Sequence, residues 1–366
     1  MGRRIAVLGS TGSIGTQALE VITESRQLEL HSIVCGSSRV ALAAQKDSCS
    51  PSYAAAVSDG SETEILAKAM DGADMVLNAI VGSAGLKASL MAMERELPLA
   101  LANKESLVVG SELLVPYVLQ GKVIPVDSEH STVFRCLLGE ERTARRITLT
   151  ASGGALRDMS SEDVPSASVE QVLAHPTWKM GGRITVDSAS LVNKAFEVLE
   201  ARALFPGIPV DAVIHRSSIV HSLVECADGA WKALLGLPNM KVPVAWALHY
   251  PDMPMEPVVC ENPLQWGTLS FEPVDKKKYP CYRAMLSAGD MGGTAPCAAN
   301  AADETAVAAF LERKISFGDI AGIIETVVES MGSEKVEDFD HLIEIDTSAR
   351  ECARKAVEDI CSHLQR

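Results

Sequence analysis

The sequence predicts a mixed α/β protein that begins with a doubly wound parallel sheet, continues into a central α+β region and ends in helices. Three observations indicate this order. Short apolar runs alternate with helical patterns through the first third of the chain, two β-type segments flank one helical pattern in the middle, and the last quarter is helical. Strands that alternate with helices form parallel sheets, because each helix carries the chain back across the sheet.

The first domain is expected to span residues 1–127. Its helical patterns include residues 16–25 and 85–96. The predicted strands are residues 5–9, 30–36, 53–57, 74–82, 97–103 and 122–127. Short apolar runs bounded by turn residues are typical of strands, so this domain is predicted to hold a six-stranded sheet.

The remaining chain is predicted to form a central domain at residues 128–250, a linker at 251–278 and a helical domain at 279–366. In the central domain, residues 145–154 and 212–236 have β-type patterns, the second with a turn at 227–229. One helix is expected between them, over residues 188–205. The proposed linker is rich in proline and irregular, as connecting segments are.

Bulk composition excludes several function classes. The 366 residues include 33 lysines and arginines against 48 aspartates and glutamates, which gives a net charge of −15. Nucleic acids and membrane surfaces are polyanionic and would be repelled. The nine cysteines contain no C-x-x-C pair, and no apolar span reaches 18 residues. We therefore expect a cytoplasmic protein with reduced thiols, no membrane segment and no nucleic-acid partner.

A glycine-rich turn follows the first predicted strand. "GSTGSIG" places Gly9, Gly12 and Gly15 between this strand and an amphipathic helix. Glycines at such a turn let the backbone approach a pyrophosphate, and the helix N-terminus offers free N–H groups. The pattern predicts a Rossmann-like dinucleotide site; a tight turn without a ligand is the alternative.

The end of the second predicted strand favours NADP over NAD. An NAD site usually has a carboxylate there for the ribose hydroxyls. Here the strand ends in "CGSSRV", which offers Ser37, Ser38 and Arg39 for a 2′-phosphate and no carboxylate. Arg39 also fits the role of a solvated residue at the start of a helix.

Carboxylates follow the sixth predicted strand. Asp127 and Glu129 lie two residues apart, which in an extended chain points both side chains the same way. A solvated turn is the simplest interpretation. Divalent cations such as Mg²⁺ prefer carboxylate oxygens, and Glu197 is a candidate third ligand from another element. On a helix, Asn193, Lys194 and Glu197 would share one face.

Further polar residues gather near the same predicted edge. Ser188 lies near the expected start of the central helix, and Ser152 ends a predicted strand. Together with Asn193 and Lys194 they would suit a phosphate at a helix N-terminus, although each alone also fits a cap or surface group. Residues 103–105, in "ANKES", follow the fifth strand and fit either a ligand site or a capped helix start.

The segment "HPTWKMGG" (residues 175–182) has the features of a mobile lid. It offers Trp178 to cover a site, with a proline on one side and two glycines on the other. A single tryptophan is more often part of a core, and that alternative stays open.

Together these segments resemble the 1-deoxy-D-xylulose 5-phosphate reductoisomerase family over essentially the whole chain. The matching motifs are "GSTGSIG", "ANKESL", "PVDSEH", "SGG", "HPTWKMG", "VDSAS" with "VNK" and Glu197, and "AADETAVAAFL". The resemblance implies isomerisation and NADPH-dependent reduction of 1-deoxy-D-xylulose 5-phosphate to 2-C-methyl-D-erythritol 4-phosphate, in isoprenoid precursor synthesis. It also implies Mg²⁺ or Mn²⁺, a sugar phosphate as the bound small molecule, and a homodimer.

The resemblance assigns a role to each matching position. NADPH would contact Thr11, Gly12, Ser13, Ile14, Gly36, Ser37, Ser38, Asn103, Glu105 and Gly181. The metal would be held by Asp127, Glu129 and Glu197. The phosphate would be held by Ser152, Ser188, Asn193 and Lys194, and Lys104, Ser128 and His175 would also reach the substrate. The implied catalytic residues are Lys104, Asp127, Glu129, His175 and Glu197, with the metal as Lewis acid in a retro-aldol rearrangement that precedes hydride transfer.

Three segments depart from the family's pattern. "HRSS" at residues 215–218 replaces "HPQS", and "AADE" at 301–304 replaces "AANE". Both are expected to lie outside the ligand shell. The third, "GSSR" at 36–39, lacks a lysine and an asparagine that some members carry, so it leaves open which residue contacts the 2′-phosphate.

Two other functions are compatible with parts of the pattern. A related NADPH-dependent reductase without isomerase activity would not need the three carboxylates, because hydride transfer alone requires no metal. A non-catalytic NADP-binding regulator would not need the phosphate set or the lid. A turnover assay separates both from the reductoisomerase.

Overall fold

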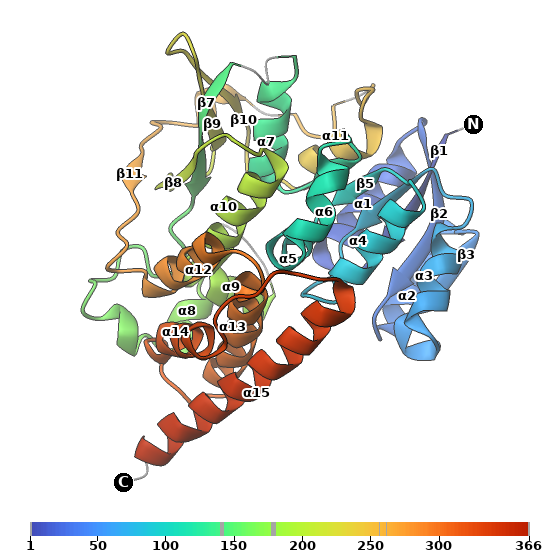
Figure 1. Ribbon diagram of the computed structural model, residues 1–366. Coiled ribbons are helices and arrows are strands. Elements are labelled where there is room, and N and C mark those ends of the chain that lie inside the picture. The colour runs from blue at the N-terminus through green and yellow to red at the C-terminus, as the bar shows by residue number, and fades with distance from the viewer. Residues whose placement is uncertain (1, 140–142, 177–180, 256, 261, 365–366) are drawn as a thin grey trace.

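The computed structural model describes residues 2–139, 143–176, 181–255, 257–260 and 262–364, and Figure 1 shows its three parts. A parallel sheet covered by helices contains the N-terminus. A second sheet lies on the other side of the molecule, and the C-terminal helices lie below α10 and around α9. The predicted mixed α/β fold, with a doubly wound first sheet and a helical end, is confirmed.

The first sheet has six parallel strands in the order β3-β2-β1-β4-β5-β6. This order reverses direction between β1 and β4, and ligands bind at such a reversal, beyond the carboxyl ends of the strands. The strands are β1 (Arg3–Leu8), β2 (Leu28–Cys35), β3 (Tyr53–Ala56), β4 (Met75–Asn78), β5 (Leu99–Leu101) and β6 (Val123–Pro125).

Helices cover both faces of this sheet, because side chains along a central strand point alternately to opposite faces. In β1, Ile5 and Val7 pack into one buried cluster, whereas Ala6 and Leu8 pack into another. The α-helices of this part are α1 (Ser13–Glu24), α2 (Arg39–Cys49), α3 (Glu62–Met70), α4 (Gly85–Glu94), α5 (Lys104–Val109) and α6 (Ser111–Val118), and a short 3₁₀ turn spans Val57–Asp59.

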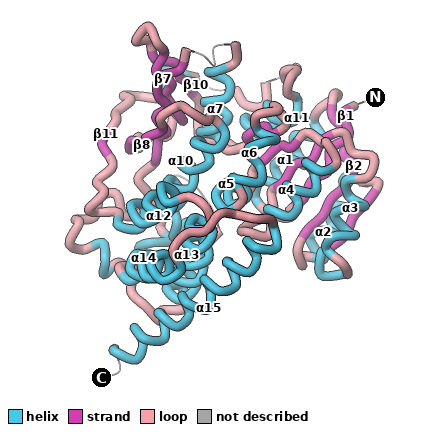
Figure 2. Tube along the Cα trace, in the orientation of Figure 1, coloured by secondary structure: helices cyan, strands magenta, loops and turns pink. Residues whose placement is uncertain are grey.

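The second sheet has five strands in the order β10-β9-β7-β8-β11. Its strands are β7 (Ala144–Ala151), β8 (Val210–Ile214), β9 (Val220–Cys226), β10 (Trp231–Leu235) and β11 (Glu272–Pro273). Buried and partly exposed residues alternate along β9, as in a strand with one covered face. The strands and helices of the whole chain are distinguished by colour in Figure 2.

The helix predicted at residues 188–205 is two helices, and this prediction was wrong. They are α9 (Gly182–Ala189) and α10 (Val192–Leu204), separated at Leu191, whose φ is 59°. A left-handed residue cannot continue a right-handed helix. Ser188 therefore lies in the last turn of α9 and not at the start of the helix that carries Glu197. The other central helices are α7 (Ser128–Leu137), α8 (Val169–Leu173) and α11 (Lys241–His249), with a 3₁₀ turn at Val164–Ser166.

The predicted domain boundaries stay a prediction. Two elements lie on one side of a predicted boundary but pack against the part on its other side. Helix α11 lies before residue 250 but packs on α1, and its residues Val244–Leu248 join the cluster that contains Ile5. Strand β11 lies inside the proposed linker and pairs with β8. A 3₁₀ turn at Pro263–Gln265 lies there too.

The C-terminal helices form one large apolar cluster with α9 and α10. They are α12 (Pro280–Met291), α13 (Ala295–Leu311), α14 (Asp319–Met331) and α15 (Phe339–Leu364). Helix α13 is the centre of this part: seven of its alanines are buried, which allows close packing of α14 and α15. Among the described residues, no helix combines the length and apolar character needed to cross a bilayer.

Candidate active site

A cavity of about 750 Å³ opens beyond the carboxyl ends of the first sheet and extends to α9, α10 and the second sheet. Most of the residues expected from the sequence to serve the site line it. Among the predicted residues, the lining includes Gly12, Ser13, Ile14, Asn103, Lys104, Glu105, Asp127, Ser128, Glu129, Ser152, Gly181, Ser188, Asn193, Lys194 and Glu197. The remaining predicted positions, Thr11, Gly36, Ser37, Ser38 and His175, are not part of that lining.

The glycine turn lies at one end of the cavity. Gly9 has a φ of +84°, and a Cβ there would come within 2.3 Å of the Ala79 carbonyl oxygen. A Cβ on Gly15 would come equally close to the Gly9 carbonyl oxygen. Gly12 is the N-cap of α1 and makes no side-chain cap, so the first N–H groups of this helix have no side-chain acceptor from that residue. The arrangement suits an anionic group at the helix N-terminus.

Strand β2 does not end in a carboxylate. An acidic side chain from another segment instead pairs with Arg39, which follows the strand. Arg39 is the first residue of α2 and forms an ion pair with Asp59 at 2.5 Å, with both side chains exposed. The structure therefore places Arg39 at a helix start, where it remains free to exchange this exposed partner for a phosphate.

Asn103 and Glu105 are held mainly by the protein itself. Asn103 is the N-cap of α5, accepts from the Ser106 N–H at 2.9 Å, and donates to Ile80, Gly82 and Glu105. The capped helix start that the sequence left open is thus present. Both residues still line the cavity, and α5 holds Lys104 toward the carboxylates.

Three carboxylates converge in the middle of the cavity. Ligand oxygens of Asp127, Glu129 and Glu197 all lie within 4.8 Å of one another. Asp127 and Glu129 do not belong to an extended chain, so that part of the expectation was wrong. Asp127 is the N-cap of α7 and accepts from the Glu129 N–H at 3.2 Å, which places Glu129 in the first helical turn. The helix cap, and not strand alternation, brings the two side chains together.

Two lysines, one buried and one partly buried, neutralise this cluster. Lys104 pairs with Asp127 and lies 3.3 Å from Glu197, whereas Lys194 lies 2.8 Å from Glu129 and also pairs with Glu197. Burial lowers the pKa of both lysines, but the neighbouring carboxylates outweigh it and raise the pKa values. Burial raises the pKa of Glu129, but Lys194, His221 and hydrogen bonds from Lys194 and Ser128 lower it to about 2. Lys104, Lys194 and Glu129 are therefore charged at neutral pH.

The predicted helical face on α10 is present. Asn193 donates to Glu197 at 2.6 Å, and Lys194 contacts the same carboxylate from the adjacent position. His130, on α7, is fully buried and its Nε2 lies 2.8 Å from the Glu197 carbonyl oxygen. Burial, followed by the charge of Lys104, lowers the pKa of His130 to about 3, so this imidazole is neutral. The backbone contact fixes α10 against α7.

The loop after β7 brings Ser152 close to Ser188. Gly154 has a φ of +68°, and a Cβ there would lie 2.4 Å from the Ser188 carbonyl oxygen. Only glycine permits this approach. Ser152 Oγ lies 3.3 Å from His175 Nε2, and burial followed by the charge of Arg157 lowers the pKa of His175. A neutral imidazole therefore lies beside the hydroxyl.

The predicted lid falls largely outside the described residues. Residues 177–180, including Trp178, are not described. On either side of them, His175 contacts Ser152, and Gly181 is the N-cap of α9.

The second sheet adds residues that the sequence patterns did not single out. Ser218, His221 and the turn Pro238–Met240 line the cavity. Ser218 belongs to the "HRSS" segment expected outside the ligand shell, and this expectation was wrong for it. Arg216 of the same segment does lie outside, where it pairs with Asp158 and Glu272. The alternating sequence pattern of β9 predicted that His221 lies on a strand. It did not predict that this strand faces the cavity.

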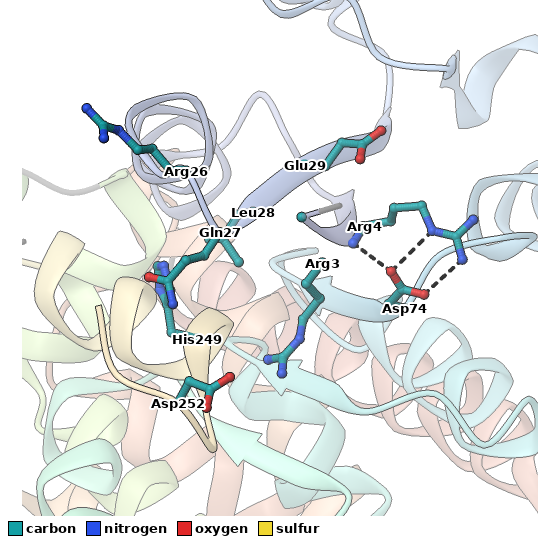
Figure 3. A pocket seen from close by; sticks show the side chains of 10 residues that line it. Arg3, Arg4, Arg26, Gln27, Leu28, Glu29, Asp74, His249 and Asp252 are labelled. Atoms are coloured by element: carbon teal, nitrogen blue, oxygen red, sulfur yellow. Dashed lines mark hydrogen bonds and ion pairs between the residues drawn. The ribbon is translucent and has the colours of Figure 1, made fainter. Parts of the chain in front are cut away.

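A second hollow, of about 940 Å³, lies at the opposite edge of the first sheet (Figure 3). Its three arginines suggest an anion site, but two of them are already engaged. Arg4 forms a two-armed pair with Asp74, and Arg3 donates to the carbonyl oxygens of Leu248 and Tyr250. Ligands of parallel sheets bind at the carboxyl edge, so the carboxylate cavity is the candidate site.

Known proteins are similar to this chain over nearly its whole length. Family models match residues 5–73 and 60–111 ("1-deoxy-D-xylulose 5-phosphate reductoisomerase"), 123–205 ("1-deoxy-D-xylulose 5-phosphate reductoisomerase C-terminal domain") and 235–352 ("DXP reductoisomerase C-terminal domain"). A 1-deoxy-D-xylulose 5-phosphate reductoisomerase of Chlorobium chlorochromatii is 40% identical over 378 residues, covering 96% of this chain and 99% of its own. One from Gloeobacter violaceus is also 40% identical, covering 97% and 98%.

Solved structures are similar over the same length. A 1-deoxy-D-xylulose 5-phosphate reductoisomerase from Zymomonas mobilis in complex with NADPH superposes with a TM-score of 0.87 at 32% identity, covering 98% of this chain and 100% of that one. A DOX-P reductoisomerase in complex with NADPH, fosmidomycin and magnesium gives 0.88 at 32% identity, covering 97% and 98%.

Proposed function

The chain belongs to the 1-deoxy-D-xylulose 5-phosphate reductoisomerase family, and we infer that it converts 1-deoxy-D-xylulose 5-phosphate to 2-C-methyl-D-erythritol 4-phosphate with NADPH and a divalent metal ion. The observation that carries this inference is the carboxylate cluster of Asp127, Glu129 and Glu197, within 4.8 Å and beside a glycine turn. A reductase that only transfers hydride, or a regulator that only binds the cofactor, has no use for this buried cluster.

The donor set fits a hard divalent cation. Three carboxylates from two elements converge, and in the structure two ammonium groups compensate their charge. Carboxylate oxygens are the ligands that Mg²⁺ and Mn²⁺ prefer. We propose that Asp127, Glu129 and Glu197 hold the metal, which when bound supplies a Lewis acid for adjacent substrate oxygens.

The cofactor site is proposed at the glycine turn. Gly12, Ser13 and Ile14 present the N-terminus of α1 to the pyrophosphate, and Gly36, Ser37, Ser38 and Arg39 receive the 2′-phosphate. Thr11, Asn103, Glu105 and Gly181 complete the proposed set. NADPH supplies the hydride for the reduction. Support comes from the absence of a carboxylate at the end of β2 and from the exposed, exchangeable pair between Arg39 and Asp59.

The chain's own residues bind the substrate's phosphate and exclude water from the reacting end. We propose that Ser152, Ser188, Asn193 and Lys194 hold the phosphate, because they come together where the loop after β7 meets α9 and α10. Lys194 also contacts two of the carboxylates, so it links the phosphate site to the metal site. Binding energy from the unreactive phosphate then orients the reacting carbons.

Proton handling falls to groups at the carboxylate end. The Lys104 ammonium lies between Asp127 and Glu197, and its raised pKa keeps it a hydrogen-bond donor to substrate oxygen. Ser128 donates to Glu129 and is placed to contact a substrate hydroxyl. The neutral imidazole of His175 lies at the phosphate end beside Ser152. We propose that the segment 175–182 covers the substrate as a lid.

Two further features are proposed. All nine cysteines are free thiols, and four of them are partly or fully exposed. Free thiols are typical of proteins in a reducing compartment such as the cytoplasm. A homodimer is proposed on family resemblance, and light scattering of the purified protein tests it.

The function is tested by incubating the purified chain with 1-deoxy-D-xylulose 5-phosphate, NADPH and Mg²⁺ and identifying the product by NMR. We expect a branched carbon skeleton, formed with one NADPH consumed per product. A reduced but unbranched polyol would indicate a reductase without isomerase activity. Cofactor binding without any product would indicate a regulator.

A further inference from the structure

A second buried charge cluster lies behind the substrate cavity, where α9, α5 and α13 meet. Its centre is Arg183, which lines the cavity from the first turn of α9. The Arg183 guanidinium lies 3.2 Å from Glu105 on α5 and 2.8 Å from Glu304 on α13. Two more carboxylates, Asp187 on α9 and Asp303 on α13, complete the cluster and are 4% and 0% exposed.

The hydrogen-bond donors are unevenly distributed among these four carboxylates. Each oxygen of Glu304 has an arginine partner, because Arg350 on α15 lies 2.6 Å from the second one. Glu105 accepts from Arg183 and from Asn103. Both glutamates are therefore satisfied as carboxylates.

The two aspartates are not satisfied in the same way. Asp187 approaches Arg183 Nε only at 3.6 Å, and its Oδ1 has no hydrogen-bond partner. Neither oxygen of Asp303 has one. A buried carboxylate without donors is costly, and the cost is greater for these two, because they are near enough for their like charges to repel at low dielectric.

A shared proton removes both costs. A carboxylic acid donates one O–H, so a protonated aspartate can donate to its ionised neighbour, as like-charged carboxylate pairs do in other proteins. We propose that Asp187 and Asp303 share one proton in a carboxyl–carboxylate hydrogen bond that fastens α9 to α13, and that this bond positions Ser188 for substrate binding in a pH-dependent way. The positioning of Ser188 rests on the proposed function, whereas the shared proton does not.

The surrounding charges support this proposal. Burial comes first and the neighbouring aspartate second in raising the pKa of Asp187 well above its usual value. For Asp303, burial raises the pKa, Arg183 opposes it, the charge of Glu304 adds to it, and a hydrogen bond from Asp187 lowers it, for a value of about 7. The Cys281 thiol on α12 is buried too, and its pKa is raised by burial and by both aspartates, so it stays neutral.

The other charged groups on the packed elements are already paired. On α15, Arg350 pairs with Asp346 as well as Glu304. On α14, Glu325 pairs with Arg283 of α12 at the surface. In the described part of the chain, no further ion pair to Asp187 or Asp303 is present besides that with Arg183.

The proposed bond gives a role to Asp303, the aspartate in "AADE". An asparagine at position 303, as in the family's usual "AANE", would donate an N–H to Asp187 at any pH. Asp187 and Asp303 make the corresponding bond only while the pair holds a proton. This chain would therefore exchange a permanent bond for one that weakens as rising pH removes protons from the pair.

The sign of the pH effect follows from the raised pKa. The unfolded aspartate releases its proton near 3.8, whereas the folded one keeps it to about 7. The stabilisation is complete below the lower value and is lost as the pH rises to the upper one. Thermal unfolding of the purified protein should therefore show a melting temperature that falls by about 5 °C more between pH 5 and pH 7.5 than that of D303N.

The matched control is D359N, which removes an exposed aspartate from α15 in the same helical region. Its melting profile should parallel that of the wild type. Should D303N not fold, D187N provides the reciprocal donor and should flatten the profile in the same way. The infrared difference between wild type and D303N at pH 6 should contain a protonated carboxyl band, whereas Glu200, whose burial raises its pKa to about 8, contributes to both proteins and cancels.

Substrate binding gives the second readout. From pH 6 to pH 8, the affinity of the wild type for fosmidomycin with Mg²⁺ should fall several-fold relative to D303N, since the shared ionisations of ligand and metal cancel in that ratio. Parallel melting profiles in wild type and D303N, or an infrared difference without a protonated carboxyl band, would overturn the shared proton. A flattened melting profile with an unchanged affinity ratio would overturn only the link to Ser188.

Discussion

Substituting Gly154 by alanine should damage catalysis more than stability. Gly154 adopts a φ of +68°, and an added Cβ would lie 2.4 Å from the Ser188 carbonyl oxygen and 2.9 Å from the Ala189 Cα. Ordinary contact starts at 3.4 Å, so the end of α9 would have to move by the difference, about 1 Å. The contacting atoms are backbone and cannot rotate away.

The expected magnitude follows from this displacement. A misplacement of about 1 Å can reduce a catalytic rate by roughly 100-fold, or about 2.7 kcal/mol in transition-state binding. We therefore expect kcat/KM of G154A to fall by roughly that factor, mainly through KM, because Ser152 and Ser188 are proposed to hold the unreactive phosphate. Stability should fall by about 1–2 kcal/mol for the left-handed alanine plus a smaller cost of moving α9.

The matched control is G121A. Gly121 has a φ of +70°, but nothing lies within 4 Å of its added Cβ. It carries the same backbone strain without the contact. Denaturant unfolding should show that the backbone strain lowers the stability of both variants by a similar amount. Steady-state kinetics should give a kcat/KM for G121A within about twofold of the wild type. Equal kcat/KM in the two variants would refute the idea that Gly154 sets the distance between Ser152 and Ser188.

Three other predictions concern the site itself. Alanine at Asp127, Glu129 or Glu197 should abolish turnover while NADPH affinity, measured by fluorescence titration, stays near that of the wild type; normal turnover in any one of them would remove that residue from the metal site. Lys194→Met should weaken phosphate binding and leave Glu129 and Glu197 without their buried cation, which costs about 3–5 kcal/mol of stability in the metal-free protein; added Mg²⁺ should restore part of this in thermal unfolding, and a variant as stable as the wild type without metal would contradict the pairing. NADPH should be preferred to NADH because β2 ends without a carboxylate, and R39A should reduce that preference more than S37A or S38A if Arg39 reads the 2′-phosphate; similar kcat/KM for both cofactors in the wild type would reject the assignment.

Much of the fold follows from local patterns. The alternation of apolar runs and helices in the first third predicted the parallel sheet, because each strand and its helix are close in sequence. The spacing of Asn193, Lys194 and Glu197 on one helical face was correct for the same reason. Even the glycine turn is local: strand, turn and helix are consecutive, and the close approaches of Gly9 and Gly15 occur within that unit or to the adjacent strand.

The features that were missed depend on contacts between distant segments. The break at Leu191 interrupts a continuous helical pattern, and only the packing of α9 against α13 and α10 against α5 and α12 accounts for it. Asp127 and Glu129 were expected on a strand, but the aspartate caps a helix instead, and either structure suits the local sequence. His221 reaches the cavity from β9, which packs on α7, and Ser218 reaches it from the loop before that strand. No local pattern carries that information.

The most direct test of the central claim is NADPH oxidation in the presence of 1-deoxy-D-xylulose 5-phosphate, before and after the metal is removed. The claim is that Asp127, Glu129 and Glu197 hold a cation without which the substrate is not rearranged and hence not reduced. Chelator should stop NADPH oxidation, added Mg²⁺ or Mn²⁺ should restore it in the wild type, and neither should restore it in E197Q. Continued oxidation in the fully chelated wild-type protein would contradict the account.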